Sequence, residues 1–484
     1  MKGGECPLFY NISVMHKIYV AGEFVSTEKK LDVINPFDNS KVSSTFIAGA
    51  EELEKAILSA QKASAIMKEM PAYKKYEILM QIAVDINIEK LHLADILAKE
   101  AGKPLKYAYG EIDRAVQTFI VAAEEAKRLP AEYLSIDWTP AGEGKEAVVK
   151  YFPIGLVAGI APFNFPLNLA VHKIAPAIAA GNCIILKPAR STPLSTLELA
   201  RIINKTDLPK GAVSILPMDR EAGNQLVTDE RFKMLSFTGS PEVGWKMKSQ
   251  AGNKKVALEL GGNAGVIVTK SADIEEAVKR CIIGSYAYQG QVCIHVQRIY
   301  VDEDVFDEFA DSFVKKVKDI KQGNPLEEDT EITSMIDEEN AIRIDNWVAD
   351  AVQKGAKILT GGKRKGTYYE PTVLTHTNSE MNVCAMEVFG PVVSLEKYTN
   401  YEDALQSVNS GRYGLQAGVF TDSIDEMNKA YYLLDVGGVI INDIPTFRVD
   451  HMPYGGVKDS GFGREGIKYA IHEMMEPKLL VKNK

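Results

Sequence analysis

Three patterns of apolar and polar residues follow one another along the chain. In the N-terminal part, apolar residues recur every three or four positions, which is the spacing of one face of an α-helix. This spacing predicts amphipathic helices over Glu51–Met67, from Tyr73 to about Lys99 and from Tyr107 to about Arg128. A strand-like segment with a glycine turn, Lys17–Phe24, precedes them.

From Ile154 onwards, short continuous apolar runs alternate with helical stretches. Such strands, separated by helices, are typical of a parallel sheet covered on both faces, and nucleotides bind at the carboxyl ends of its strands. The predicted strands are Gly155–Ile160, Cys183–Leu186, Ala212–Leu216 and Lys233–Phe237, and the predicted helices are about Asn168–Ala180, Pro193–Ile203, Glu221–Thr228 and Pro241–Gln250.

A second α/β series follows Glu259. Its predicted strands are Gly265–Val268, Ile294–Val301, Val392–Lys397, Ala417–Phe420 and Gly438–Ile441, and its predicted helices are Asp273–Tyr288, Asp304–Lys318 and Glu338–Lys354. Two α/β series are therefore expected, and the length of 484 residues predicts two or three domains.

Between the helical part and the first α/β series, Tyr133–Trp138 and Glu146–Phe152 flank a turn rich in glycine. This pattern predicts a β-hairpin, and the strand-like tail Pro477–Val481 is its natural partner. Because such a hairpin exposes edge strands, we expect pairing with another subunit, and hence a homo-oligomer, a dimer or a tetramer.

Composition limits the functional classes. The chain is 46% hydrophobic and 25% charged with a net charge of −9, as in an ordinary globular protein, and this balance argues against nucleic acid or an anionic membrane as a partner. Five widely spaced cysteines fit neither a disulfide framework nor a metal site, so no metal is expected.

Without an apolar run of membrane-spanning length or a secretion signal, we expect a cytoplasmic protein. Residues before Met15 resemble a loose extension, and Met15 is a candidate start.

Cys293 lies in Gly290-Gln291-Val292-Cys293, at the junction of a predicted helix and a predicted strand. A cysteine there can face a substrate, and a thiolate is a strong nucleophile at neutral pH. The alternative is a buried cysteine that acts as a small hydrophobic residue.

Two polar residues at rigid loops are candidates for the same chemistry. Asn164, between prolines in Pro162-Phe163-Asn164-Phe165-Pro166, can donate to a developing oxyanion together with the Cys293 backbone N–H. Glu259, between apolar residues and before Gly261 and Gly262, is a candidate general base, because an apolar setting raises the pKa of a carboxyl group. A local turn bond for Asn164 and an exposed strand end for Glu259 are the alternatives.

Candidate dinucleotide contacts lie at two strand ends. Phe237-Thr238-Gly239-Ser240-Pro241 ends a strand and opens a helix, where Ser240 suits the N-cap and free N–H groups favour an anion, although no GxGxxG fingerprint is present. Lys187 follows the buried strand Cys183–Leu186 and can bind a ribose. A plain turn and a solvated lysine are the alternatives.

These motifs, in this order, resemble the NAD(P)-dependent aldehyde dehydrogenase superfamily. The matching segments are PFNFP around Asn164, FTGS with the later Gly244, LELGG around Glu259, GQVC around Cys293, EVFGP around Glu387, and Met452–Gly461. The resemblance covers nearly the whole chain except about the first fifteen residues.

The resemblance implies an α/β fold with a Rossmann-type parallel-sheet cofactor domain, an α/β catalytic domain and a small β bridging segment. Its implied boundaries are 1–127 and 153–258 for the NAD(P)-binding domain, 259–465 for the catalytic domain, and 128–152 with 466–484 for the bridging or oligomerisation domain.

The resemblance also implies roles. Cys293 would attack the aldehyde carbon, Asn164 would hold the thiohemiacetal, and Glu259 would activate the water that hydrolyses the thioester. The implied cofactor contacts are Lys187, Arg190, Gly223, Phe237, Gly239, Ser240, Gly244, Glu387 and Phe389. Relatives that prefer NAD have a glutamate where this chain has Arg190, so we expect NADP to serve at least as well as NAD.

The substrate is expected to be a small polar aldehyde. Arg114, Asn168 and Arg448 are candidate substrate contacts, because the neighbouring sequence resembles lactaldehyde, glyceraldehyde and non-phosphorylating glyceraldehyde-3-phosphate dehydrogenases. Ion pairing is the alternative for both arginines. Val292, where enzymes for the phosphorylated aldehyde have arginine, makes a phosphorylated substrate the weaker alternative.

Other classes stay open at this point. A CoA-acylating dehydrogenase, a semialdehyde dehydrogenase, a thiol esterase and a catalytically inactive binding protein each share part of the pattern. The retained Glu259 argues against CoA acylation, and the dinucleotide motifs argue against an esterase.

Overall fold

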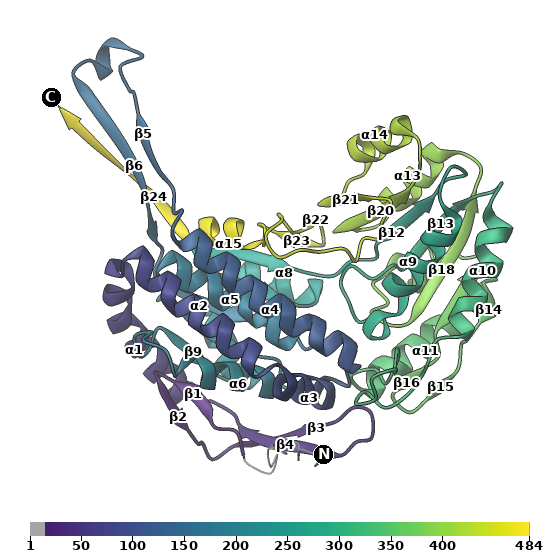
Figure 1. Cartoon of the computed structure of the whole chain (residues 1–484), viewed down its shortest axis with the longest axis horizontal. Coiled ribbons are helices and arrows are strands. Elements are labelled where there is room, and N and C mark those ends of the chain that lie inside the picture. The colour runs from purple at the N-terminus through teal and green to yellow at the C-terminus, as the bar shows by residue number, and fades with distance from the viewer. Residues whose placement is uncertain (1–14, 484) are drawn as a thin grey trace, which may run out of the picture.

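The computed structural model describes residues 15–483, so the predicted extension before Met15 lies outside the described part. Two large sheets with their helices form the body, and a narrow three-stranded arm projects from it (Figure 1). Within residues 15–483, no helix combines the length and apolar character that a membrane crossing needs.

The first sheet has eight strands in the order β2-β1-β9-β8-β7-β10-β11-β23, and its central strands are parallel. The predicted strands of this region are confirmed with small changes in length. The bounds are β1 Ile18–Val20, β2 Glu23–Val25, β7 Leu156–Ile160, β8 Cys183–Lys187, β9 Val213–Ile215, β10 Phe232–Thr238, β11 Lys255–Glu259 and β23 Gly461–Phe462.

Helices cover both faces of this sheet (Figure 1). Every residue of α5 is buried, because α5 packs between the sheet strands and the N-terminal helices. The bounds are α1 Ala50–Glu69, α2 Ala72–Ile88, α3 Lys90–Ala101, α4 Leu105–Ala126, α5 Pro166–Ala180, α6 Leu194–Ile203, α7 Arg220–Thr228, α8 Pro241–Gln250 and α15 Ile467–Glu473.

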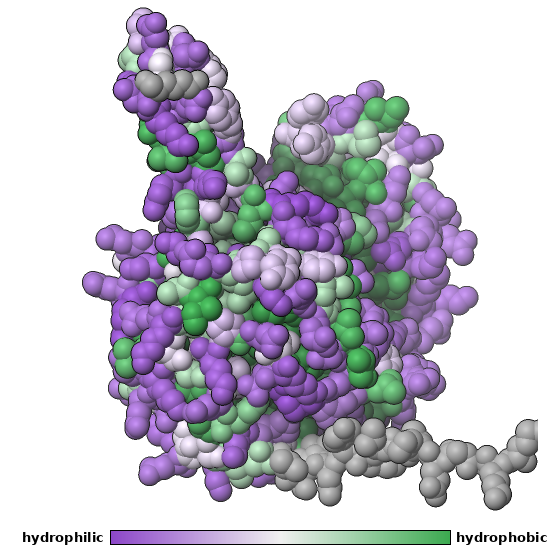
Figure 2. Space-filling model, turned by 60° about the vertical axis from the view of Figure 1, so that its left-hand side comes forward, coloured by the Kyte–Doolittle hydropathy of each residue, from purple (hydrophilic) through white to green (hydrophobic). Residues whose placement is uncertain are grey.

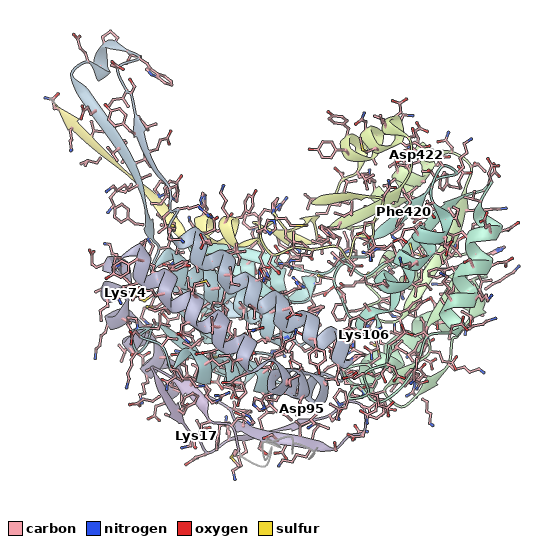
Figure 3. All side chains as sticks on the ribbon, viewed as in Figure 1. Lys17, Lys74, Asp95, Lys106, Phe420 and Asp422 are labelled. Carbon is pink, nitrogen blue, oxygen red and sulfur yellow. The ribbon has the colours of Figure 1, made fainter. Side chains whose placement is uncertain are left out.

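The second sheet has seven strands in the order β14-β17-β18-β13-β12-β20-β21 and is mainly parallel. Figure 3 labels Phe420 at the end of β20, where it is buried, and Asp422, which is exposed two residues later. The strands are β12 Gly265–Val268, β13 Arg298–Asp302, β14 Lys357–Thr360, β17 Thr372–Thr375, β18 Val392–Tyr398, β20 Gln416–Phe420 and β21 Gly438–Ile441. The helical segments here are α9 Ile274–Tyr286, η2 Ala287–Gly290, α10 Phe306–Lys318, α11 Glu338–Gln353, α12 Asn382–Ala385, α13 Tyr401–Asn409 and α14 Ile424–Leu433.

The arm consists of β5 Ala131–Leu134, the turn η1 Pro140–Gly142, β6 Lys145–Pro153 and the C-terminal strand β24 Met475–Asn483. β24 pairs antiparallel with β6 along its whole length, so the predicted pairing of tail and hairpin is confirmed. Apolar side chains are visible along the arm (Figure 2), and Trp138, Leu479 and Leu480 are exposed on it.

Two sequence predictions need correction. The helix predicted from Tyr73 to Lys99 is two helices, because the backbone leaves helical geometry at Glu89 and α3 turns to pack against α6. The strand predicted from Ile294 begins only at Arg298, since the amides of His295 and Val296 bond to a turn and to the Gly284 carbonyl instead of a neighbouring strand.

Several elements were not predicted. Two of them, α13 and α14, start at the capping side chains of Asn400 and Ser423, each followed by acidic residues, which is a signal of a helix start. Short strands were missed as well, namely β3 Lys30–Ile34, β4 Lys41–Phe46, β15 Arg364–Lys365, β16 Tyr368–Tyr369, β19 Tyr413–Gly414 and β22 Val457–Lys458. Strand β23 lies within the predicted catalytic domain but pairs with β11 of the first sheet.

Candidate active site

Cys293 lies on a loop that leaves α9 by a sharp turn. Tyr288, Gln289 and Gly290 all have positive φ, at 48°, 55° and 68°, a conformation that costs free energy for side-chain-bearing residues. Surrounding bonds hold the turn, since the Tyr288 hydroxyl donates to the Ala101 carbonyl at 2.9 Å. The result is a thiol that is only partly buried, not the fully buried cysteine of the alternative interpretation.

Asn164 lies beside this loop and is buried. Its Nδ2 donates to the backbone carbonyl of Gln291 at 2.9 Å, which fixes the amide group next to the segment that carries Cys293. An amide nitrogen has two N–H groups, so one remains available to a ligand. Among the described residues, the backbone N–H of Cys293 has no hydrogen-bond partner either. Two donors from adjoining segments are therefore available to a ligand, as an oxyanion site requires.

Glu259 is the last residue of β11, where it pairs in register with Thr238 of β10 and Gly461 of β23. Positions 261 and 262 require glycine, because other segments of the chain approach the backbone closely there. A Cβ on Gly262 would lie 2.4 Å from the Cys293 carbonyl oxygen, and one on Gly261 would lie 2.2 Å from a Glu387 carboxylate oxygen. The Leu258–Gly262 motif thus brings the first sheet against both the Cys293 loop and the Glu387 loop.

The carboxyl group of Glu259 is buried. Desolvation, followed by the nearby Glu465 carboxylate, raises its pKa well above the ordinary value, while Arg448 and Lys173 act in the opposite direction. Within residues 15–483, Oε2 of Glu259 has no hydrogen-bond partner. A carboxyl group of raised pKa with an unsatisfied oxygen can accept a proton from water.

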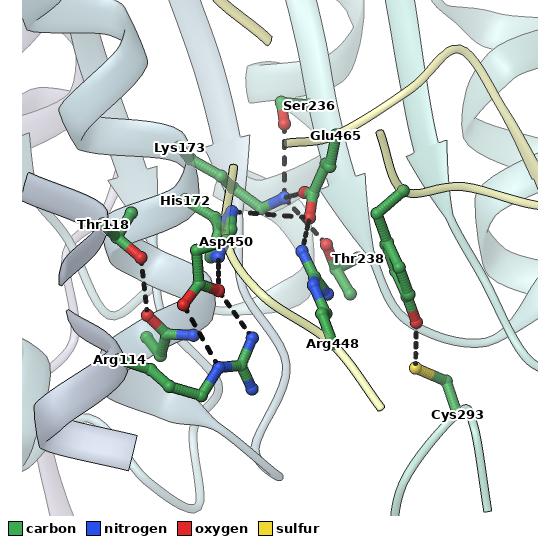
Figure 4. A network of polar contacts seen from close by, with 12 residues as sticks. Arg114, Thr118, His172, Lys173, Ser236, Thr238, Cys293, Arg448, Asp450 and Glu465 are labelled. Atoms are coloured by element: carbon green, nitrogen blue, oxygen red, sulfur yellow. Dashed lines mark hydrogen bonds and ion pairs between the residues drawn. The ribbon is translucent and has the colours of Figure 1, made fainter. Parts of the chain in front are cut away.

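A buried polar network surrounds this region (Figure 4). Arg114 donates to Asp450 at 2.7 Å, and Asp450 also contacts His172 at 2.8 Å. On the other side, Arg448 donates to Glu465 at 3.0 Å, and Lys173 contacts the same carboxylate at 3.3 Å.

Both arginines therefore take part in ion pairs, which was the alternative to substrate contact. Ion pairing does not use every donor, because a guanidinium carries five N–H groups. Arg114 keeps 29% of its side chain exposed, and Nε of Arg448 is buried without a partner in the described part of the chain.

Asn168, the third candidate substrate contact, is fully buried on α5. Its Oδ1 accepts from the Thr118 hydroxyl at 3.3 Å, and its Nδ2 has no partner within the described range. The side chain therefore lies between α5 and α4, next to Thr118, and its amide nitrogen is an unsatisfied donor group.

Three of the predicted cofactor residues, Lys187, Arg190 and Gly223, line a cavity of about 610 Å³ at the carboxyl ends of β7 and β8. Lys187 extends across Gly223 of α7, where an added Cβ would lie 3.2 Å from the lysine Cε. Arg190 is exposed at the rim, and Arg220, the first residue of α7, lines the same cavity. Sequence reasoning missed Arg220, although its position directly before Glu221 at a predicted helix start was a usable signal.

The first turn of α8 borders this cavity through Glu242 and Val243. Ser240 occupies the predicted N-cap position and Pro241 begins the helix, but the Ser240 hydroxyl makes no capping bond, so among the described residues it is free for another partner. An added Cβ would collide with the Phe237 ring at Gly239 and with Leu260 at Gly244. Close packing therefore brings the helix terminus to the strand end, where its N–H groups can bind an anion.

Glu387 and Phe389 lie on a loop beside Gly262. The carboxylate of Glu387 accepts from the Gly262 N–H at 2.9 Å, and burial raises its pKa to about 8. Phe389, at a positive φ of 49°, packs edge-on against Phe163 with ring centroids 5.8 Å apart. Phe389 thus packs against the Asn164 loop, and Glu387 lies at the pair of glycines that approaches the Cys293 carbonyl.

Tyr454 belongs to the Met452–Gly461 motif, and its sequence context predicts no role for it. Its hydroxyl lies 3.1 Å from Sγ of Cys293. No local pattern in the sequence connects the two, because 161 positions separate them.

A family model described as the aldehyde dehydrogenase family matches residues 24–480. The 3-sulfolactaldehyde dehydrogenase of Priestia megaterium is 43% identical over 467 residues, which cover 96% of this chain and 98% of that protein. The lactaldehyde dehydrogenase of Methanocaldococcus jannaschii is 42% identical over 472 residues, covering 96% and 100%.

Solved structures of similar fold also carry aldehyde dehydrogenase names. Aldehyde dehydrogenase 21 of Physcomitrella patens, in complex with the reaction product succinate, superposes with a TM-score of 0.96 at 45% identity over 97% of this chain and 98% of that one. The glyceraldehyde-3-phosphate dehydrogenase GapN of Methanocaldococcus jannaschii, complexed with NADP, gives 0.91 at 41% over 95% and 100%. Betaine aldehyde dehydrogenase of Staphylococcus aureus, in complex with NAD+, gives 0.93 at 32% over 97% and 94%.

Proposed function

The chain belongs to the aldehyde dehydrogenase family, and from that premise we propose that it oxidises a small hydroxylated aldehyde to the carboxylic acid with NAD(P)+. The observation that carries the proposal is the convergence of Cys293, Asn164 and Glu259. These residues come from three distant segments and gather at the junction of the two sheets. Nucleophile, oxyanion donor and base are the groups that thioester chemistry at an aldehyde requires.

In this mechanism Sγ of Cys293 attacks the carbonyl carbon and forms a thiohemiacetal. Nδ2 of Asn164 and the N–H of Cys293 donate to the oxygen that gains charge. Bound NAD(P)+ supplies the hydride acceptor, and Lys187, Arg190, Gly223, Ser240, Glu387 and the α8 terminus are the groups that would hold it. Glu259 then takes a proton from the water that hydrolyses the thioester, which releases the acid and restores the thiol.

The charges around the site favour an aldehyde with a polar or anionic end. Arg114, Lys173 and Arg448 contribute three cations, whereas the lowered pKa values of Asp450 and Glu465 keep two carboxylates ionised. With Glu259 protonated, one positive charge is in excess. A buried excess charge is costly unless it is paired, so an anionic substrate group near the arginines gains affinity.

The names of the relatives support this substrate class. Sulfolactaldehyde and lactaldehyde are three-carbon hydroxyaldehydes, and sulfolactaldehyde and the succinate bound to the Physcomitrella protein carry anionic ends. A semialdehyde therefore remains the second candidate, favoured by the same excess charge. Val292 disfavours a phosphorylated aldehyde, and the retained Glu259 disfavours transfer of the acyl group to CoA.

An aldehyde panel tests the proposed activity. We expect kcat/KM for lactaldehyde, glyceraldehyde or sulfolactaldehyde to exceed that for hexanal and benzaldehyde by about tenfold or more, the discrimination that a few buried polar contacts provide. NAD(P)H formation is the measurement, and Cys293→Ala is the control that should give none. A preference for benzaldehyde, or turnover that requires CoA, would refute the proposal.

Glu259→Gln tests the base. Hydride transfer should survive while steady-state turnover falls about a hundredfold or more, because an amide cannot accept the proton of water. Rapid mixing should show a burst of NAD(P)H and then a slow phase. Because its pKa is raised, ionised Glu259 gains population as pH increases, so wild-type deacylation should quicken with pH and the variant should lose this dependence. Equal steady-state rates would remove Glu259 from the mechanism.

We also propose that Arg190 contributes to cofactor choice. A guanidinium at the cavity rim can pair with the 2′-phosphate of NADP, so NADP should serve at least as well as NAD. Arg190→Glu should lower the ratio of kcat/KM for NADP over NAD by about ten- to a hundredfold, through lost attraction and added repulsion. Arg220→Glu, tested in parallel, measures the share of the second cation. An unchanged ratio in Arg190→Glu would show that Arg190 does not contact the 2′ position.

Finally, we propose a homo-oligomer. The arm exposes Leu479, Leu480 and Val481, and α14, beside the edge strand β21, exposes Ile424, Tyr431 and Tyr432. Apolar patches of this kind mark protein interfaces. Light scattering should give at least twice the chain mass of 53.2 kDa, and Leu480→Asp should weaken the assembly. Ile88→Asp, at an exposed site on α2, should leave it intact, and a monomeric wild type would refute the proposal.

A further inference from the structure

The hydroxyl of Tyr454 has one hydrogen-bond partner in the described part of the chain, the sulfur of Cys293 at 3.1 Å. The dashed line that ends at Cys293 in Figure 4 marks this contact. Tyr454 is only 3% exposed, so its hydroxyl is largely shielded from bulk water. A polar group in such a setting interacts more strongly than it would in solvent.

The position of the Tyr454 ring is fixed from several sides. The backbone amides of Tyr454 and Glu465 donate to each other's carbonyl oxygens, at 3.0 and 2.6 Å. The guanidinium of Arg448 lies over the ring, 3.6 Å from its centroid, and Glu465 holds that guanidinium by an ion pair. The hydroxyl therefore keeps its direction towards Cys293 whether the sulfur is protonated or not.

The direction of the hydrogen bond follows from the two acidities. Burial, with Cys293 as the next contributor, raises the pKa of Tyr454 well above its usual value, so the phenol keeps its proton. A thiolate has no proton to donate. Once Cys293 has ionised, Tyr454 must be the donor and the sulfur the acceptor.

We propose that Tyr454 is a catalytic residue that donates a hydrogen bond to the Cys293 thiolate and so increases its population at neutral pH. The proposal deepens the proposed function and depends on Cys293 being the nucleophile. Tyr454 transfers no proton. The thiol proton leaves to solvent, the sulfur lone pair forms the bond to the aldehyde carbon, and the negative charge moves from sulfur to the oxygen held by Asn164.

The surroundings of the sulfur both raise and lower the pKa of Cys293. Burial is the largest influence and raises the pKa of Cys293 to about 11, with smaller increases from Glu387 and Glu259. Tyr454 and then Arg448 lower the pKa, and of these two Tyr454 makes the direct contact. Loss of the hydroxyl would thus leave the thiolate without a hydrogen-bond donor from any side chain of residues 15–483.

The test is the alkylation of Cys293 in Tyr454→Phe, a variant that retains the ring over Arg448. A hydrogen bond to a charged group corresponds to about one to two pKa units. The stronger nucleophilicity of a more basic thiolate offsets roughly half of the lost population, so the rate at neutral pH should fall about three- to tenfold. Labelling with iodoacetamide from about pH 6 to about pH 10, followed by peptide mass spectrometry, should show a profile displaced to higher pH.

Two controls isolate the effect. Tyr286→Phe removes another buried phenol, which donates to the Thr372 carbonyl, and should leave the Cys293 profile unchanged. In every sample Cys384, also partly exposed, should react at the wild-type rate. Thermal unfolding of Tyr454→Phe should resemble that of Tyr286→Phe.

The outcomes separate this proposal from the one it rests on. If Cys293→Ala is inactive but Tyr454→Phe is alkylated like wild type at every pH, the role of Tyr454 is refuted and that of Cys293 stands. A raised KM for hydroxylated aldehydes with unchanged alkylation would also refute it, because the hydroxyl would then contact substrate. If Cys293→Ala oxidises aldehydes, the proposed function itself fails.

Discussion

The ammonium group of Lys103, fully buried where the two halves of the body meet, holds the Asn164 loop against the Cys293 loop. It forms an ion pair with Glu111, donates to the backbone carbonyl of Asn164 at 2.6 Å, and lies 4.0 Å from the Phe165 ring centroid and 4.4 Å from that of Tyr288. Burying such a charge costs several kcal/mol unless its partners compensate. Four groups from three segments of the chain compensate the Lys103 charge. The buried ammonium group thereby fixes the oxyanion donor Asn164 relative to the nucleophile Cys293.

Glu111 extends this constraint to the scaffold. Besides pairing with Lys103, it accepts from the backbone N–H groups of Leu167 at 2.9 Å and Asn168 at 3.1 Å, at the start of α5. Glu100 does the same for α6 through Leu194 and Ser195, and burial raises the pKa of Glu100 to about 7. Neither helix has a capping side chain of its own, so distant carboxylates satisfy N–H groups that would otherwise be buried without partners.

This arrangement explains which features were predictable from the sequence. Strands such as Gly265–Val268 and helices such as Pro241–Gln250 were predicted with correct bounds, because apolar periodicity and proline are local signals. Lys103 carries no such signal, since its partners lie up to 185 positions away along the chain. The pairs Arg114–Asp450 and Cys293–Tyr454 are invisible for the same reason. Sequence reasoning nominated Arg114, but the fold decides which carboxylate neutralises it.

The two buried carboxyl groups at the centre show how the fold assigns different tasks to similar residues. Glu259 and Glu465 lie near the same cations, Arg448 and Lys173, yet the pKa of Glu259 is raised and that of Glu465 is lowered. Contact explains the difference, because Glu465 makes direct ion pairs with both cations whereas Oε2 of Glu259 has no partner in residues 15–483. Carboxyl groups whose environments separate their pKa values mark a division between a fixed charge and an exchangeable proton. Glu465 can therefore serve as the permanent anion that orients Arg448 and, through it, the ring of Tyr454, which leaves Glu259 free to gain and lose a proton beside the thioester.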